Sequence, residues 1–431
     1  MENFLTYLAK YNPNIENIFS KTLKDTLNKL YRISLTRDEK IYLVGGIVRD
    51  IFLGKNSADI DLVLEGDSKE FALSILPSFS VSKHRYTERF LTYNIFTKTG
   101  TNIDVAAFRE EIYEHSGALP VIAPSSIEND YARRDFTINA MYISFDKEAR
   151  LYDPLNALQD IENKIIKIIH EKSFEDDPTR IFRAVKFAAR YNFTFEENTE
   201  RLLKEAMEKN YLANISNMRL KNEIYMLLAE KNLTGILTYF RELGIFRFLN
   251  IPNPTDEDIQ EIYKIIREPL FRKIKREKQI SKGNFILMFL MRNLSFDEKM
   301  ECLKVFELSE KNLNSILFQE GEAEKSIKKL SEIYKQLHHM APFKVLYLYY
   351  VYKENSEKIK RYIFELCDKS AIISSSDLIK AGFKTDACFG KYLKKSFLIQ
   401  LDMKNPTKEK IIAKLMEELK RNGQIQCEDS I

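Results

Sequence analysis

A glycine pair and a pair of aspartates near the start of the chain place the strongest constraint on its fold. The run Val44-Gly45-Gly46-Ile47-Val48-Arg49-Asp50 puts a glycine turn between an apolar run and a short amphipathic stretch. The run Asp59-Ile60-Asp61-Leu62 follows, with two carboxylates two positions apart. Because side chains alternate between the faces of a strand, both aspartates should lie on one face, with their apolar neighbours toward the core.

Two like charges on one face of a half-buried strand repel each other unless a cation lies between them. A divalent metal held by Asp59 and Asp61 is the most economical explanation, and hard oxygen ligands favour Mg²⁺. The backbone N–H groups of Gly45 and Gly46 can approach phosphate closely. A D-x-D pair alone is more often a pair of exposed acids at a strand end, but the nearby glycine turn favours metal-assisted chemistry on a nucleoside triphosphate.

Length and composition limit the classes of protein to which this chain can belong. At 431 residues the chain should form two to four domains, and its 13 glycines and 11 prolines predict a mostly helical protein with few long loops. No apolar run is long enough to suggest a membrane span, and Met1–Phe4 does not begin a signal-peptide pattern. Scattered cysteines and five histidines argue against a zinc site and fit a reducing cytoplasm. The net charge of +4 permits a nucleic-acid partner without requiring one.

The pattern along the chain changes at about Asp160. Before this point, alternation and turn residues predict an α/β region of roughly 145 residues, within the usual size of one domain. After it, helical periodicity dominates, as at Ile181, Ala184, Val185 and Ala188. A proline-containing linker is expected at 251–255. The expected strands are Lys40–Val44, Asp59–Leu64, Phe90–Thr97, Asn102–Phe108 and Asn139–Phe145, with helices over 1–36 and Ser68–Leu76 and a mobile loop over Arg109–Ala123.

A third acid extends the predicted metal site. Asp104 lies in Asn102-Ile103-Asp104-Val105, on a predicted strand. If this strand pairs beside that of Asp59 and Asp61, Asp104 could join them around metal. The chemistry would be two-metal nucleotidyl transfer, in which one ion lowers the pKa of an attacking hydroxyl and the other neutralises the triphosphate and the leaving pyrophosphate.

Three polar positions could hold the triphosphate or the sugar. Arg49 can add a charge-assisted contact beside the glycine turn, although it could instead pair with Asp50 or Glu65. The run Arg133-Arg134-Asp135-Phe136-Thr137-Ile138-Asn139 offers two arginines for phosphate and Asn139 for a sugar or phosphate oxygen. The alternative for this run is a solvated turn in which Asp135 caps a helix.

The run Asp176-Asp177-Pro178-Thr179-Arg180-Ile181-Phe182-Arg183 has two interpretations of about equal weight. In one, Asp177 caps a helix and pairs with Arg180. In the other, Asp177 and Arg180 share a helix face and read a nucleobase. Cytosine and adenine both present an amino donor beside a ring-nitrogen acceptor, which a carboxylate and a guanidinium match. Uracil and guanine present the opposite order and would be rejected.

Taken in this order, the motifs resemble those of class II tRNA nucleotidyltransferases, the CCA-adding enzymes, in a family that includes bacterial poly(A) polymerases. The likeness covers about residues 40–250, and beyond this range it is faint. Many relatives carry Glu-Asp where this chain has Asp176-Asp177. The further matching pieces are Leu151-Tyr152-Asp153-Pro154 and the helix Ile215–Leu228 with Ser216, Arg219 and Glu223.

The resemblance implies an α+β fold, with a polymerase-β-like nucleotidyltransferase head over 1–150, a helical neck over 151–250, and a helical, tRNA-binding body and tail over 251–431. It implies addition of C and A from CTP and ATP to the 3′ end of tRNA, with Mg²⁺. Asp59 and Asp61 would bind the metal, with Asp104 as the assisting acid. The implied nucleotide-binding residues are Gly45, Gly46, Arg49, Arg134, Asn139, Asp177, Arg180 and Arg183.

Several alternatives stay open. The chain could add only CC or only A, or it could be a poly(A) polymerase or an inactive RNA-binding protein on the same fold. The loop Arg109–Ala123 has the full length that the family uses to switch from C to A, which favours competence for A. Family poly(A) polymerases usually carry a long basic C-terminal extension, whereas an amphipathic segment and a short tail with two acids end this sequence.

Overall fold

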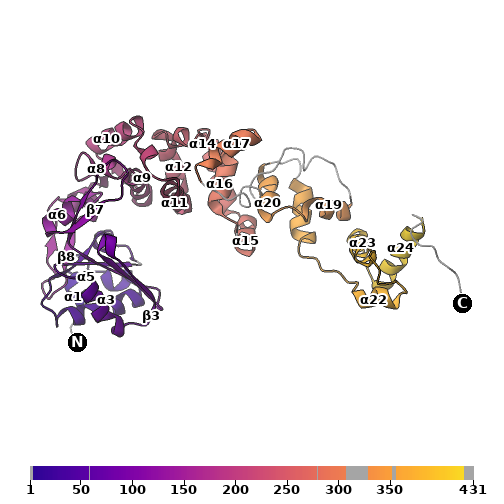
Figure 1. Ribbon diagram of the computed structural model, residues 1–431, viewed down its shortest axis with the longest axis horizontal. Helices are drawn as coiled ribbons and strands as arrows, with labels where there is room; N and C mark the ends of the chain where they lie inside the picture. The colour runs from indigo at the N-terminus through magenta and orange to yellow at the C-terminus, as the bar shows by residue number, and fades with distance from the viewer. Residues whose placement is uncertain (1–2, 58, 279, 307–328, 352–355, 422–431) are drawn as a thin grey trace. The chain divides into compact units, whose positions relative to one another are not determined.

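The computed structural model describes residues 3–57, 59–278, 280–306, 329–351 and 356–421 (Figure 1). The chain divides into two compact units, Met1–Leu249 and Asn250–Ile431. The first contains a mixed sheet followed by helices, and the second is helical in its described residues, so the expected α+β fold is confirmed. None of the described helices has the length and apolar character needed to cross a bilayer.

A seven-stranded mixed sheet forms the centre of the first unit, in the order β3-β4-β5-β2-β1-β8-β9. Only β2 and β5 are parallel neighbours, and the other pairs are antiparallel. The alternation expected for Asp59-Ile60-Asp61-Leu62 is present: Ile60 and Leu62 are buried, Asp59 is exposed and Asp61 is half-buried. The strands are β1 (Ile41–Val44), β2 (Asp59–Leu64), β3 (Val81–Thr87), β4 (Thr92–Thr97), β5 (Asn102–Ala107), β8 (Tyr142–Ser144) and β9 (Leu151–Tyr152).

Short helices accompany this sheet in the indigo part of Figure 1. Helix α5 packs against β4 and β5. Ser20 begins α3 by accepting the Leu23 N–H, and α3 then buries Leu23, Leu27 and Leu30 on one face. These helices are α1 (Phe4–Leu8), α2 (Ile15–Ile18), α3 (Lys21–Ser34), α4 (Gly46–Phe52), α5 (Ser68–Ile75) and α6 (Ile127–Ala132).

The expected irregular loop over Arg109–Ala123 is wrong in part, because this segment begins and ends in strands. β6 (Arg109–Ile112) and β7 (Val121–Pro124) form an antiparallel hairpin of their own. Part of its charge is paired within the protein, since Glu111 accepts from Arg109 (3.2 Å) and from Arg133 (2.8 Å). The polarity of Arg109 and Glu111 therefore did not indicate exposure, because their charges are compensated.

The rest of the first unit is mostly helical, and several of its elements pack against helix α9 (Thr179–Tyr191). The predicted periodicity is confirmed, since Ile181, Ala184, Val185 and Ala188 are all buried. The helix packs against α11 and α12 and ends at Asn192, which adopts a left-handed conformation. The other helices of this part are α7 (Ala157–Glu162), α8 (Ser173–Asp176), α10 (Glu197–Glu208), α11 (Asn217–Ala229), α12 (Leu233–Glu242) and α13 (Ile245–Phe248), with the short parallel pair β10 (Ile165–Ile166) and β11 (Thr194–Phe195).

The second unit holds at least two separate apolar cores. One gathers residues of α19, α20 and α23 around Leu337 and Leu348, and the other joins α22, α23 and α24 around Leu378 and Leu415. The acidic C-terminal tail at 422–431 lies outside the described residues. The helices are α14 (Asp256–Arg267), α15 (Pro269–Glu277), α16 (Lys282–Leu290), α17 (Phe296–Lys304), α19 (Leu330–Leu337), α20 (Pro342–Val351), α21 (Ser356–Arg361), α22 (Ser375–Lys380), α23 (Phe389–Asp402) and α24 (Lys408–Arg421).

Candidate active site

Asp59, Asp61 and Asp104 lie on two neighbouring strands and share one face of the sheet. β2 and β5 pair in parallel, with Asp61 opposite Asp104 and Asp59 opposite Asn102. In-register residues of adjacent strands present their side chains to the same face. Asn102 Nδ2 donates to Asp59 Oδ1 (2.8 Å), and Asn94 on β4 donates to Asp104 Oδ1 (2.7 Å). The two strands thus meet the condition under which Asp104 could join Asp59 and Asp61.

The three acids strain one another electrostatically. Burial and the neighbouring Asp104 carboxylate raise the pKa of Asp61 to about 7. The positive charges of Arg134 and Arg49 oppose this shift without cancelling it. Burial, with a smaller contribution from Asp59, also raises the pKa of Asp104. Both shifts arise first from burial and then from neighbouring carboxylates, and a bound cation would favour the ionised forms.

The donor set at these acids suits a hard divalent cation. Carboxylate oxygens are the ligands that Mg²⁺ prefers. Within the described residues, no group of three or more His, Cys, Asp or Glu side chains forms a ready-made metal cage. Mg²⁺ commonly uses one or two protein carboxylates and completes its shell with water and substrate phosphates. The carboxylates of Asp59 and Asp61 therefore suit a hard divalent cation such as Mg²⁺ that takes its remaining ligands from outside the protein.

The glycine turn lies directly beside Asp61. Gly45 adopts φ +70° between β1 and α4, a conformation that side chains other than glycine rarely adopt. A Cβ atom on Gly45 would lie 3.5 Å from Asp61 Oδ2 and 3.7 Å from Arg134 Nη1. The turn therefore brings together a carboxylate, a guanidinium and a backbone free of side chains, which is the environment expected at a phosphate site.

Arg49 is buried behind this turn, with 5% of its surface exposed. Its guanidinium donates to Asp50 Oδ1 (2.9 Å) and to Asn139 Oδ1 (2.5 Å). It also lies over the rings of Tyr191 and Phe187 on α9, with centroid distances of 4.8 and 5.2 Å. Of the two interpretations of Arg49, this structure adopts the pairing with Asp50. These contacts use three of the five N–H groups of the guanidinium, so a triphosphate contact through the others would not require the side chain to leave its partners.

Asp130, which the sequence did not single out, holds the predicted phosphate-binding arginine. Asp130 is 0% exposed, and its Oδ2 accepts from Arg134 (2.8 Å) and from the Tyr142 hydroxyl (2.7 Å). Its Oδ1 accepts from Arg133 (2.7 Å). Burial alone would raise the pKa of Asp130, but Arg134 and Arg133 outweigh burial and hold it below its usual range. The spacing to these arginines, i to i+3 and i+4 from Asp130 at the end of α6, was the available sequence signal.

Asp135 similarly anchors two residues that were expected to bind nucleotide. Its Oδ2 accepts from Arg183 Nε (2.6 Å), and its Oδ1 accepts from Asn139 Nδ2 (3.0 Å). Asp135 is buried and does not cap a helix in a solvated turn, so that alternative is wrong. These two hydrogen bonds of Asp135 connect the segment after α6 to α9, and they bring Arg183 and Asn139 together.

Asp177 and Arg180 lie at the start of α9, where the Arg180 N–H donates to the Asp177 carbonyl (2.9 Å), but the described bonds of their side chains go to other residues. Asp177 precedes the helix in an extended conformation, so the expectation that both residues share a helix face is wrong. Its Oδ1 accepts from Thr179 N (3.2 Å), as a capping residue does, and from Arg219 Nη2 (2.9 Å) on α11. Arg180 donates instead to Ser173 Oγ and to the Arg133 carbonyl, both at 2.7 Å.

The hairpin connection between β6 and β7 is attached to the same region through Gly117. The Gly117 carbonyl accepts from Arg219 Nη1 (3.0 Å), and its N–H donates to the Asp176 carbonyl (3.4 Å). Gly117 has φ +75°, and a Cβ atom there would lie 2.5 Å from the Asn214 carbonyl oxygen. The side chain of Arg219 thus links the hairpin connection to Asp177, because it donates to both.

Gly117→Ala is expected to detach this connection, because the added Cβ overlaps the backbone of residue 214 and the positive φ disfavours alanine. Limited proteolysis within residues 113–120 should become at least about tenfold faster. Gly100→Ala is the matched control, since Gly100 has φ +89° but no atom within 4 Å of the added Cβ. Equal proteolysis of the two variants would contradict the attachment.

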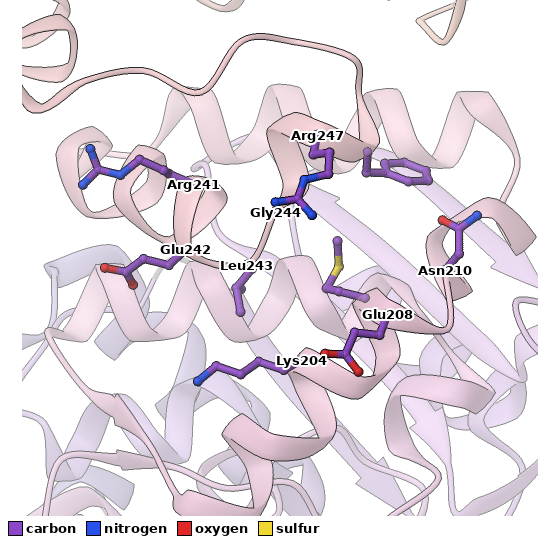
Figure 2. Close-up of a pocket in the computed structure, with 10 residues that line it drawn as sticks. Lys204, Glu208, Asn210, Arg241, Glu242, Leu243, Gly244 and Arg247 are labelled. Carbon is purple, nitrogen blue, oxygen red and sulfur yellow. The ribbon is translucent and has the colours of Figure 1, made fainter.

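A separate cavity of about 450 Å³ lies among α10, α12 and α13 (Figure 2). Figure 2 shows basic and acidic side chains around it, including Lys204 and Glu208 from α10 and Arg247 from α13. None of the predicted site residues lines this cavity. Its mixed charge does not select one class of ligand, and the candidate site remains the region around the three acids.

Two family models match the first unit. The Poly A polymerase head domain matches residues 41–167, which contain the three acids and the glycine turn. The probable RNA and SrmB-binding site of polymerase A matches residues 192–255. A solved structure of a CCA-adding enzyme in an apo form aligns with 97% of this chain and 99% of its own, at a TM-score of 0.77 and 26% identity. Residues 41–167 and 192–255 thus belong to domain families of poly(A) polymerases, and the chain is similar to tRNA nucleotidyltransferases over most of its length.

Curated relatives of this chain include enzymes that add A. An A-adding tRNA nucleotidyltransferase of Aquifex aeolicus is 33% identical over 76% of this chain and 40% of its own length. Another, from Halalkalibacterium halodurans, is 34% identical over 56% of this chain and 58% of its own length. This chain thus spans less than two thirds of either relative. Nucleotidyltransferases of the family generally use divalent metal ions.

Proposed function

We propose that this protein adds C and A from CTP and ATP to the 3′ end of tRNA, releases pyrophosphate and uses Mg²⁺. The observation that carries the proposal is the set of three acids on adjacent strands beside the Gly45 turn. A bound Mg²⁺ would lower the pKa of the tRNA 3′ hydroxyl and neutralise charge on the triphosphate. Asp59 and Asp61 would hold it, and Asp104 would assist from the neighbouring strand.

The groups around these acids would hold the triphosphate. Gly45 lets phosphate oxygens approach the backbone without meeting a side chain. The guanidinium of Arg134 lies beside this turn and is kept in place by Asp130, so it is oriented before substrate arrives. Arg49, Asn139 and Arg183 would contribute mainly by fixing the turn against α9, since protein partners already engage each of them.

Asp177 and Arg180 would select the base. Among the described residues, hydrogen bonds reach only Oδ1 of Asp177, which leaves Oδ2 to accept from an amino group of cytosine or adenine. The Nε–H of Arg180 has no partner in the described part of the chain and could donate to the adjacent ring nitrogen. Uracil and guanine would place donors and acceptors in the opposite order.

Arg180→Ala is expected to reduce the preference for ATP over UTP and GTP by about 10- to 100-fold, because it removes the donor to the ring nitrogen. The ratios of kcat/KM for the four nucleotides measure this, with tRNA affinity nearly unchanged. Arg190→Ala is the control, since Arg190 lies on the same helix but pairs with Glu230. Unchanged selectivity and rate in Arg180→Ala would reduce Arg180 to a structural residue.

A second candidate function is addition of A alone. The two relatives described above, at 33% and 34% identity, both carry that name. The full-length structural match, at 26% identity, is with a CCA-adding enzyme. Both candidates require the same acids and the same base-reading pair, and they differ in whether CTP is accepted on a tRNA that lacks the CC sequence.

A further inference from the structure

Three acceptors surround the guanidinium of Arg180, which is 4% exposed. Nη1 donates to Ser173 Oγ (2.7 Å) and contacts His170 Nε2 (3.3 Å). Nη2 donates to the Arg133 carbonyl (2.7 Å). A guanidinium has five N–H donors in one rigid plane, so these contacts occupy three and leave the Nε–H and one Nη2–H. The positions of the acceptors thus fix which donors remain for a ligand.

The contact with His170 sets a requirement on the imidazole. Both partners would donate if His170 were protonated, so Nε2 can accept only in the neutral ring with its proton on Nδ1. Burial and the charge of Arg180 lower the pKa of His170 to about 4, so the ring is neutral near pH 7. Nδ1 lies 3.9 Å from Asp176 Oδ2, and this carboxylate oxygen favours the proton on Nδ1.

Local backbone structure holds both acceptors together. His170 lies just before α8, and its carbonyl accepts the Ser173 N–H (3.1 Å) in a tight turn. Ser173 is fully buried at the first position of α8, so its hydroxyl is confined beside Arg180. The turn between β10 and α8 therefore presents two acceptors to one nitrogen of the guanidinium.

We infer that His170 and Ser173 are positioning residues that orient Arg180 for base selection. The inference rests on the proposed base-reading function of Arg180. Without either acceptor, the guanidinium can rotate about its terminal bonds, and the direction of its free donors is no longer fixed. Discrimination between nucleotides should then fall while the protein keeps its fold and its affinity for tRNA.

The test compares His170→Met with His170→Gln. Methionine fills similar space without a strong acceptor, whereas the glutamine amide oxygen can replace Nε2. His170→Met should lower the ratio of kcat/KM for ATP over that for UTP by about 3- to 30-fold, the range for one lost hydrogen bond. His170→Gln should retain the ratio within about threefold. Ser173→Ala should lower the ratio in the same direction as His170→Met.

The double variant separates positioning from a general structural role. In an Arg180→Ala background, His170→Met should cause no further loss of selectivity, because its effect passes through Arg180. Thermal unfolding of each variant shows whether the fold is kept. If Arg180→Ala loses selectivity but His170→Met does not, or if the two losses add, the positioning inference is wrong. If Arg180→Ala keeps its selectivity, the base-reading proposal itself fails.

Discussion

Asp61→Ala should lower nucleotide incorporation at least about a thousandfold, because a carboxylate that binds the catalytic metal supplies several kcal/mol of transition-state stabilisation. The substitution should not destabilise the fold. Burial and the Asp104 charge penalise the ionised Asp61, so removing this carboxylate relieves repulsion. Steady-state incorporation onto tRNA and the thermal unfolding midpoint measure the two effects, and tRNA affinity should be unchanged.

Asp25→Ala provides the matched control for this loss. Asp25 is an exposed acid of α3 in the same unit and has no described hydrogen bond or ion pair. Its removal should change neither rate nor stability appreciably. Incorporation by Asp61→Ala within tenfold of the unaltered protein would contradict a metal-binding role for this aspartate, provided that the protein remains folded.

Among these substitutions, Asp130→Ala should cause the largest decrease in the free energy of unfolding. Its removal leaves the half-buried arginines Arg133 and Arg134 without their shared, fully buried carboxylate, and breaking a buried ion pair in this way costs about 3–5 kcal/mol. Urea unfolding measures the loss as a lower midpoint. Asn129→Ala, at the exposed neighbouring position, should cost less than about 1 kcal/mol. A similar midpoint for both variants would contradict the role of Asp130.

The pH dependence of this contribution follows from the lowered pKa of Asp130. A carboxyl whose pKa is lower in the folded than in the unfolded state stabilises the fold above its unfolded pKa, near 4. That stability is lost as the pH falls from there through the lower folded value. The unaltered protein and Asp130→Ala should therefore differ most in stability near neutral pH, and the difference should shrink in acid.

The sequence predicted the strands of the site because their patterns are local. Alternation in Asp59–Leu64 and in the segment around Asp104 identified both strands, and one buried face leaves little freedom in their register. The glycine turn could also be predicted from the sequence, because the positive φ at position 45 strongly favours glycine. These features depend on residues within a few positions of one another.

The remainder depends on partners that are distant in sequence. Nothing near Arg49 predicts its contact with Asn139, 90 positions away, or with the rings of α9. Likewise, the side chain of Asp177 bonds to Arg219, 42 positions away, and not to the side chain of Arg180. Charged residues in the β6–β7 hairpin resembled a solvated loop, because their compensation by Arg133 appears only in the fold. Such pairings are fixed by tertiary packing and leave little trace in local patterns.

The most direct test of the proposed function is incorporation onto three tRNA transcripts, ending at the discriminator base, at –C and at –CC. Each is given Mg²⁺ with CTP, ATP or both. Full CCA addition predicts that all three reach –CCA with both nucleotides and then stop. Extension of the –CC transcript alone would limit the function to A addition. Absence of incorporation on every transcript would contradict the assignment of Asp59, Asp61 and Asp104 to nucleotidyl transfer.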